Sequence, residues 1–149
     1  MTTAIHLCGP EDFERLDSLV ARFHEEMQIA SDPEARRAGL LPLLDGSPLG
    51  AAWLFGPSQA PSGYVVATFG WSVEFAGMDA FIDEIYVRPS IRGRGIATEV
   101  LHAIATALRD GGIRALHLEV ARDDAGAQRL YAKSGFHMRD RYCLMTREF

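Results

Sequence analysis

The spacing of apolar residues predicts two helices in the first third of the chain. Residues 13–27 carry an apolar side chain every three or four positions, after a proline and two acidic residues that suit a helix start. A second helix is expected from Ser31-Asp32-Pro33-Glu34 to the Asp45-Gly46-Ser47-Pro48 turn. A short strand at residues 4–8 precedes both helices.

Extended apolar runs predict strands in the middle of the chain, at residues 51–55, 64–75 and 81–87. The turns between them are short, which implies an antiparallel arrangement. After residue 95 the pattern changes to helix, strand, short helix and final strand, at 97–108, 115–120, 127–136 and 142–147. A helix between two strands is a parallel crossover. We therefore expect one mixed sheet with helices on both faces.

Bulk composition narrows the class of protein. A chain of 149 residues with 48% apolar content predicts a single domain spanning residues 1–149. The formal charge of −5 argues against nucleic acid as a main partner and is compatible with a cationic substrate. The sequence has neither a signal peptide nor a long apolar run, so we expect a cytoplasmic protein without a membrane partner. It also lacks a Cys/His cluster with metal-ligand spacing, so no metal site is expected.

A basic, glycine-containing loop follows the strand at residues 81–87. Pro89 ends that strand, and Arg92-Gly93-Arg94-Gly95 leads into the next helix. The first amides of a helix have no internal partner and carry the positive end of its dipole. The glycines let a ligand approach the backbone closely, and the arginines add positive charge. The loop therefore predicts a ligand that carries phosphate.

Three kinds of phosphate-binding loop are candidates for this stretch. A nucleotide P-loop needs Lys followed by Ser or Thr after its second glycine, which this loop lacks. A dinucleotide loop matches in part, through the two glycines and Glu119, but Thr98 replaces its third small residue and five residues separate strand from glycines. The pattern R-x-x-G-x-A is met by Arg92, Gly95 and Ala97. It resembles the pyrophosphate loop of the GNAT superfamily of acyl-CoA-dependent N-acetyltransferases.

The resemblance extends from residue 82 to residue 136. Asp83 to Val87 has the family's order of two acidic residues, an apolar residue, an aromatic residue and valine, and the short helix with Tyr131 ends at Gly135-Phe136. The resemblance implies the acyl-CoA N-acyltransferase fold of the α/β (α+β mixed sheet) class. Its strands are mostly antiparallel, with a central parallel pair that splays apart.

The resemblance also implies acetyl-CoA as the cofactor. Its pantetheine arm would bind as an added strand in the gap between the splayed strands, and its pyrophosphate would bind the loop amides. Asp124 begins the last helix where relatives usually have asparagine; aspartate caps a helix equally well but lacks the amide donor. The implied cofactor-binding residues are Ile85, Tyr86, Val87, Arg92, Gly93, Arg94, Gly95, Ile96, Ala97, Thr98 and Asp124.

Acetyl transfer to an amine requires a base, because an alkylamine is almost fully protonated at neutral pH. Glu84 is the preferred candidate and Asp83 its rival; alternation puts their side chains on opposite faces unless the strand is bulged. Tyr131 is expected to protonate the leaving thiolate. The implied function is transfer of an acetyl group to a primary amine of a small molecule or peptide, by direct attack in a ternary complex.

Two other functions remain open, a non-catalytic CoA-binding or regulatory module and a dinucleotide-binding oxidoreductase. The acidic residues at the first two expected helices either face an amine or form a solvated surface. The scattered histidines His6, His24, His102 and His137 are interpreted as surface or packing residues. The sequence does not fix the acceptor, the acyl-chain preference or the oligomeric state, for which a homodimer is the commonest outcome.

Overall fold

The computed structural model describes residues 2–149. It divides into two compact units, Met1–Glu119 and Val120–Phe149, and each unit is described separately. The elements of the first unit are β1 (Ile5–Leu7), α1 (Phe13–Glu26), α2 (Pro33–Leu44), β2 (Gly50–Phe55), β3 (Gly63–Ser72), β4 (Gly77–Val87), α3 (Ile96–Asp110) and β5 (Ala115–Leu118).

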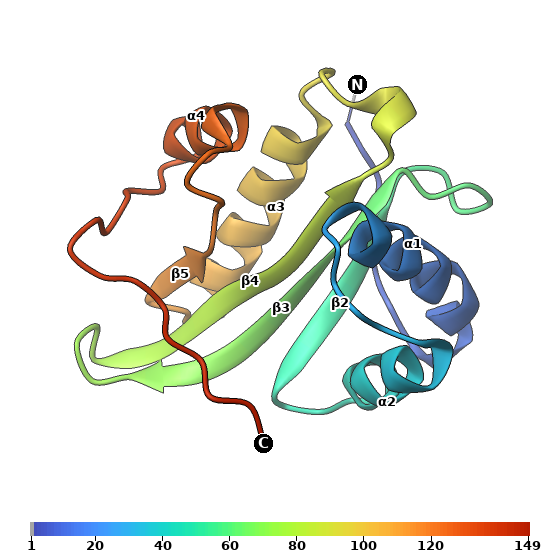
Figure 1. Ribbon diagram of the computed structural model, residues 1–149, viewed down its shortest axis with the longest axis horizontal. Coiled ribbons are helices and arrows are strands. Elements are labelled where there is room, and N and C mark those ends of the chain that lie inside the picture. Colours follow the sequence, from blue (N-terminus) through green and yellow to red (C-terminus); the bar gives the residue numbers. More distant parts are fainter. Residues whose placement is uncertain (1) are drawn as a thin grey trace. The chain divides into compact units, whose positions relative to one another are not determined.

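The five strands of the first unit form one mixed sheet in the order β1-β2-β3-β4-β5 (Figure 1). The pairs from β1 to β4 are antiparallel, and β4 and β5 are parallel. Strands that are neighbours in the sheet are therefore also successive in the chain. The mixed α/β fold predicted from the sequence is confirmed.

Helices cover both faces of this sheet (Figure 1). One face carries α1 and α2, whose buried side chains pack on alternate residues of β2, β3 and β4. Val65 and Ala67 are fully buried and alternate with those residues, so they point to the opposite face, where α3 packs against β4. The core residues on the α1 and α2 side are Cys8, Phe13, Leu16, Leu19, Val20, Leu40, Leu44, Ala52, Leu54, Tyr64, Val66 and Tyr86.

Local sequence explains where the helices of the first unit begin. The side chain of Asp32 accepts a hydrogen bond from the Ala35 amide at 2.8 Å and so caps α2, with Pro33 at the first helical position. Gly95 precedes α3 in a left-handed conformation, with φ of +79°. None of the helices within residues 2–149 has the length and apolar content needed to cross a membrane.

The second unit contains α4 (Ala125–Lys133), which Asp124 caps by accepting a 3.0 Å hydrogen bond from the Ala127 amide. The prediction of a final strand at 142–147 is wrong, because residues 134–149 form neither helix nor strand. Leu144 and Met145 are exposed by 69% and 91%, and no strand pairs with their segment. In the described chain the parallel pair of β4 and β5 therefore lies at an edge of the sheet.

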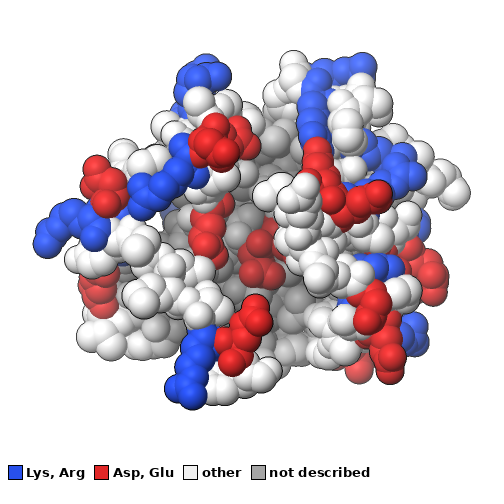
Figure 2. Space-filling view, in the orientation of Figure 1, with Lys and Arg blue, Asp and Glu red and all other residues white. Residues whose placement is uncertain are grey.

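Lys and Arg side chains are interspersed with Asp and Glu side chains on the face shown in Figure 2. This distribution agrees with the modest net charge of −5. The absence of a nucleic-acid partner remains a prediction from the sequence.

The core between α1 and the sheet can be tested with Leu16, which is fully buried. We expect Leu16→Ala to lower the free energy of unfolding by about 2–5 kcal/mol, through lost burial and the cavity left behind. Leu49 is 68% exposed, and Leu49→Ala should change the free energy of unfolding by less than about 0.5 kcal/mol. Urea unfolding of both variants measures this difference, and equal losses would contradict the assigned core.

Candidate active site

A bulge in β4 brings two carboxylates to one pocket. Val66 of β3 lies opposite Glu84, but the next residue, Ala67, lies opposite Ile82, so Asp83 is an extra residue in β4. A bulge of this kind interrupts the regular alternation of side chains. Asp83 and Glu84 both line the same pocket as a result. The sequence left open which of the two is the catalytic base, and in the structure both face the same pocket.

The pocket lies between α1, α2 and the sheet and has a volume of about 260 Å³. Part of its wall is apolar and includes Val20, Leu40 and Val66. The carboxylates of Asp83 and Glu84 provide negative charge in the same wall. An apolar pocket with a few convergent polar groups is the usual form of a small-molecule site. This pocket can accept a small cationic ligand with an apolar portion.

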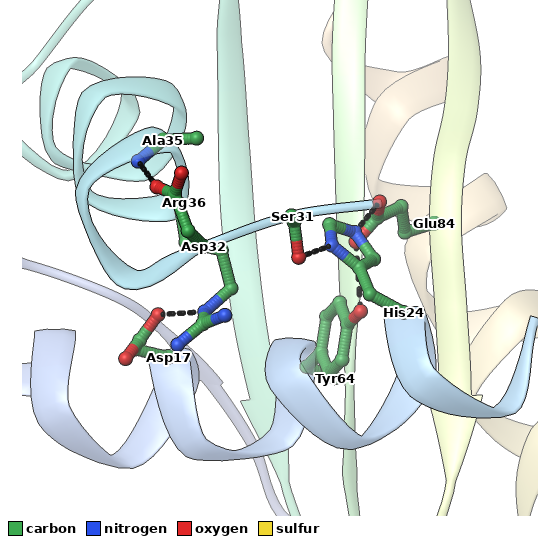
Figure 3. A network of polar contacts seen from close by, with 8 residues as sticks. All are labelled: Asp17, His24, Ser31, Asp32, Ala35, Arg36, Tyr64 and Glu84. Atoms are coloured by element: carbon green, nitrogen blue, oxygen red, sulfur yellow. Dashed lines mark hydrogen bonds and ion pairs between the residues drawn. The ribbon is translucent and has the colours of Figure 1, made fainter. Parts of the chain in front are cut away.

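Glu84 is held by hydrogen bonds from two neighbouring elements (Figure 3). The Tyr64 hydroxyl on β3 donates to Glu84 Oε1 at 2.7 Å, and His24 Nε2 on α1 lies 2.6 Å from Glu84 Oε2. His24 Nδ1 lies 2.8 Å from the Ser31 hydroxyl in the segment between α1 and α2. The side chains of His24 and Glu84 are only 14% and 17% exposed. Glu84 thus has a fixed orientation in a partly desolvated position.

The phenol of Tyr64 stays protonated in this arrangement. Its burial, and then the neighbouring charge of Glu84, raise the pKa of Tyr64 far above its ordinary value. A hydroxyl that keeps its proton remains a donor, so Tyr64 holds the Glu84 side chain in place.

His24 contacts Glu84, whereas the sequence indicated only a surface or packing residue at this position. His24 follows Val20 by one helical turn and therefore falls beside the apolar stripe of α1. A polar side chain at the margin of a buried stripe is the signal that could have identified it. Its partner Glu84 lies 60 residues further along the chain, which no local pattern reveals.

The predicted phosphate loop is open in the structure. Gly93 and Gly95 have φ of +80° and +79°, and a Cβ added at either would meet no atom within 4 Å. No side chain caps the start of α3. The first backbone hydrogen bond of this helix runs from the Glu99 amide to the Gly95 carbonyl. The amides of residues 96–98 therefore point out of the helix without an internal acceptor. This geometry suits an anion.

The Arg92 side chain is paired with other parts of the first unit, and its binding to a cofactor remains a prediction from the sequence. Its guanidinium forms two 2.7 Å hydrogen bonds with the carboxylate of Glu26, and its Nε donates to the Val87 carbonyl at 2.8 Å. It also lies over the Tyr86 ring, 5.5 Å from the centroid. The hydrogen bonds from Arg92 lower the pKa of Glu26, so this pair is ionised. Arg92 thus fixes the loop to β4 and, through Glu26, to the end of α1.

The edge of β4 beside the loop is open. The ladder between β4 and β5 ends at Ile82 and Leu118, while β4 continues to Val87 with β3 as its strand partner. The Arg88 amide donates to the Ser62 carbonyl on the β3 side at 2.9 Å. Since alternate peptide groups face opposite edges of a strand, Ile85 and Val87 direct theirs away from β3. Within residues 2–149 no strand pairs with that edge beyond Ile82.

Tyr131 and Asp124 belong to the second unit. The Tyr131 ring packs edge to face against Phe136, with centroids 6.1 Å apart. Burial, and then the charge of Asp124, raise the pKa of Tyr131, so its phenol carries a proton at neutral pH. It is therefore able to act as a proton donor.

The sequence profile of the Acetyltransferase (GNAT) family matches residues 13–136. The chain belongs to this family. The match includes the open loop, the bulged strand with both carboxylates, and the helix with Tyr131.

Individual relatives agree with this assignment. A thialysine N-epsilon-acetyltransferase from Bos taurus is 32% identical over 82 residues, which are 54% of this chain and 48% of that protein. The chain thus matches about half the length of this curated relative. An integron cassette protein from the mobile metagenome of Cole Harbour Salt Marsh has a TM-score of 0.84 and 29% identity, over 96% of this chain and 89% of that one. An aminoglycoside N-acetyltransferase in complex with CoA has a TM-score of 0.81 and 17% identity, over 99% and 95% of the chains, which shows the fold alone.

The open loop can be tested by adding one methyl group to its backbone. We expect Gly95→Ala to lower the free energy of unfolding by about 1–2 kcal/mol, because alanine resists the left-handed conformation. The altered loop amides should also weaken CoA binding, by roughly tenfold if they lose about 1.4 kcal/mol of interaction.

Gly46 provides a matched control, since it has φ of +85° and equally open surroundings in the turn after α2. Gly46→Ala should cause a similar loss of stability and leave CoA affinity unchanged. Calorimetric titration with CoA and urea unfolding separate the two effects. Equal CoA affinity in the two variants would show that the loop does not bind the ligand.

Proposed function

We propose that the protein is an acetyl-CoA-dependent N-acetyltransferase that acetylates a primary amine of a small molecule or peptide by direct attack in a ternary complex. The observation that carries the proposal is the position of Glu84. It is a partly buried carboxylate that Tyr64 and His24 hold in the pocket wall. Glu84 lies on the part of β4 that extends beyond the ladder with β5. Family membership and the name of one relative, the thialysine N-epsilon-acetyltransferase, support the reaction type.

The residues of the first unit fit CoA in two respects. The outward peptide groups of Ile85 and Val87 would hold the pantetheine arm as an added strand, although the Val87 carbonyl already accepts from Arg92. The amides of residues 96–98, with Arg94 beside them, would hold the pyrophosphate. When bound, acetyl-CoA supplies the thioester carbonyl that the amine attacks. Ile96, Ala97 and Thr98 are thus proposed as backbone donors, and Arg92, Gly93, Gly95 and Tyr86 as residues that shape the site.

The proposed reaction forms an N–C bond, breaks the thioester C–S bond and removes two protons from the nitrogen of an alkylammonium. Glu84 takes the first proton and makes the amine nucleophilic. Asp83 is the rival base, since it lines the same pocket with greater exposure. Tyr131 is proposed to give its proton to the thiol sulfur and to regain one from the second proton that leaves the nitrogen. Asp124 is proposed to contact the cofactor. Both of these roles rest on their place in the family's motif.

The pocket favours one kind of acceptor. Its volume of about 260 Å³ and its apolar wall suit a primary amine on a slender, partly apolar chain. The carboxylates favour the ammonium form for binding, and the apolar wall packs on the chain that carries it. Three further predictions from the sequence remain. They are a single domain over residues 1–149, a cytoplasmic location and a possible homodimer.

We expect Glu84→Gln to lower kcat by roughly 10²–10⁴-fold, the usual contribution of a general base, because glutamine preserves shape and hydrogen bonding but cannot accept the proton. The KM for acetyl-CoA should stay within about twofold, since Glu84 lies outside the loop. The measurement is free-thiol release with a panel of amines, with the acetylated product identified by mass. Asp83→Asn should have the smaller effect, and a larger one would make Asp83 the base.

Asp110 is an exposed residue at the end of α3, and Asp110→Asn serves as the matched control with unchanged kcat. A Glu84→Gln enzyme as active as wild type, with Asp83→Asn also active, would contradict acid–base catalysis by this strand. CoA binding without turnover of any amine by wild type would favour the non-catalytic CoA-binding module. Membership in the GNAT family argues against the dinucleotide-binding oxidoreductase.

A further inference from the structure

The pocket wall carries a chain of hydrogen bonds that connects Glu84 to an exposed side chain (Figure 3). Glu84 Oε2 contacts His24 Nε2 at 2.6 Å, and His24 Nδ1 contacts Ser31 Oγ at 2.8 Å. Glu84 and His24 are mostly buried, whereas Ser31 is exposed in the segment between α1 and α2. The three side chains thus connect the pocket wall to solvent through two short contacts.

A base in this position needs an exit for the proton that it receives. In the proposed reaction an ammonium and a thioester become an amide, a neutral thiol and one free proton, so one proton must reach water in every turnover. Tyr64, the other partner of Glu84, cannot provide that exit, because it is fully buried and keeps its own proton. Among the hydrogen bonds of residues 2–149, only the branch through His24 connects Glu84 to an exposed side chain.

Imidazole is suited to transfer a proton between two partners, because its two nitrogens face different directions and its charge changes near neutral pH. His24 directs one nitrogen to Glu84 and the other to Ser31. The other charged or titratable groups facing this site are Asp83 and Tyr86 from β4, Tyr64 from β3, and Arg36 from α2. Arg36 donates from Nε to Asp17 of α1 at 2.7 Å, so its charge is balanced within that pair.

We propose that His24 is the proton exit of the active site. Beside ionised Glu84, His24 donates from Nε2, and Nδ1 accepts from the Ser31 hydroxyl. Once Glu84 is protonated, proton exchange with water moves the ring proton of His24 from Nε2 to Nδ1. Nε2 then accepts the proton of Glu84 while the proton on Nδ1 leaves through the Ser31 hydroxyl to water. This transfer restores the starting tautomer, and no group other than water gains or loses a proton overall. His24 acts through Glu84 and is a positioning and relay residue. This inference rests on the proposed function of Glu84 as the base.

The test compares His24→Gln and His24→Ala with His102→Gln, an exposed histidine on α3. Glutamine can still donate to Glu84 but cannot relay a proton. We expect kcat at pH 7 to fall at least about tenfold in both His24 variants, near the lower end of acid–base contributions, with an unchanged KM for acetyl-CoA. His102→Gln should match wild type, and Ser31→Ala should show a smaller loss, since water can replace a hydroxyl.

Chemical rescue separates a relay from a structural role. Added imidazole should restore activity to His24→Ala, in which the side-chain space is vacant, and not to His24→Gln, in which it is filled. More basic substituted imidazoles of similar size should rescue faster. The acetylated amine is measured directly, so that acetylation of imidazole itself is not counted. If His24→Ala does not fold, the kcat of a folded His24→Gln decides the question.

The outcomes distinguish this inference from the proposed function. A wild-type enzyme that acetylates an amine, with His24→Gln within about twofold of its kcat, refutes the relay and leaves the acetyltransferase assignment intact. Absence of imidazole rescue in a folded but impaired His24→Ala also refutes it. Absence of wild-type turnover with every amine refutes the proposed function, and the relay with it.

Discussion

The single extra residue in β4 is the constraint on which the site depends. Without the bulge at Asp83, regular alternation would point Asp83 and Glu84 to opposite faces, and β4 would stay in register with both neighbours. With the bulge, Glu84 lies in the wall of the pocket between α1, α2 and the sheet. The ladder between β4 and β5 ends at Ile82, one residue before Asp83. One irregularity in strand pairing therefore coincides with both an open backbone edge and a carboxylate in the adjacent pocket wall.

The surrounding contacts keep this irregular segment in place. Tyr64 and His24 satisfy the two oxygens of Glu84, so a carboxylate that is 17% exposed retains its hydrogen bonds. On the other side of the strand end, Arg92 connects the Val87 carbonyl to Glu26 at the end of α1. These contacts join α1 to both the pocket and the loop. Changes at the end of α1 are therefore expected to affect both.

The sequence predicted those features that depend on neighbouring residues. The apolar stripe of α1, the helix start at residues 31–34 and the glycines before α3 are local signals, and the three helices that they predicted are present. Features that depend on pairing between distant segments were not predictable in the same way. The bulge requires the register of β3 against β4, the His24 contact spans 60 residues and the Arg92 contact spans 66. The strand expected at 142–147 is absent for the same reason. An apolar run forms a strand only where another strand can pair with it.

In the proposed complex, the free edge of β4 and the first amides of α3 together receive CoA. Backbone amide hydrogen exchange with and without saturating CoA tests this binding mode, because both groups of amides would acquire acceptors in the complex. We expect slower exchange within residues 85–87 and 93–98, with little change in β1 and β2. Unchanged exchange in those two segments, with protection elsewhere in the chain, would contradict it.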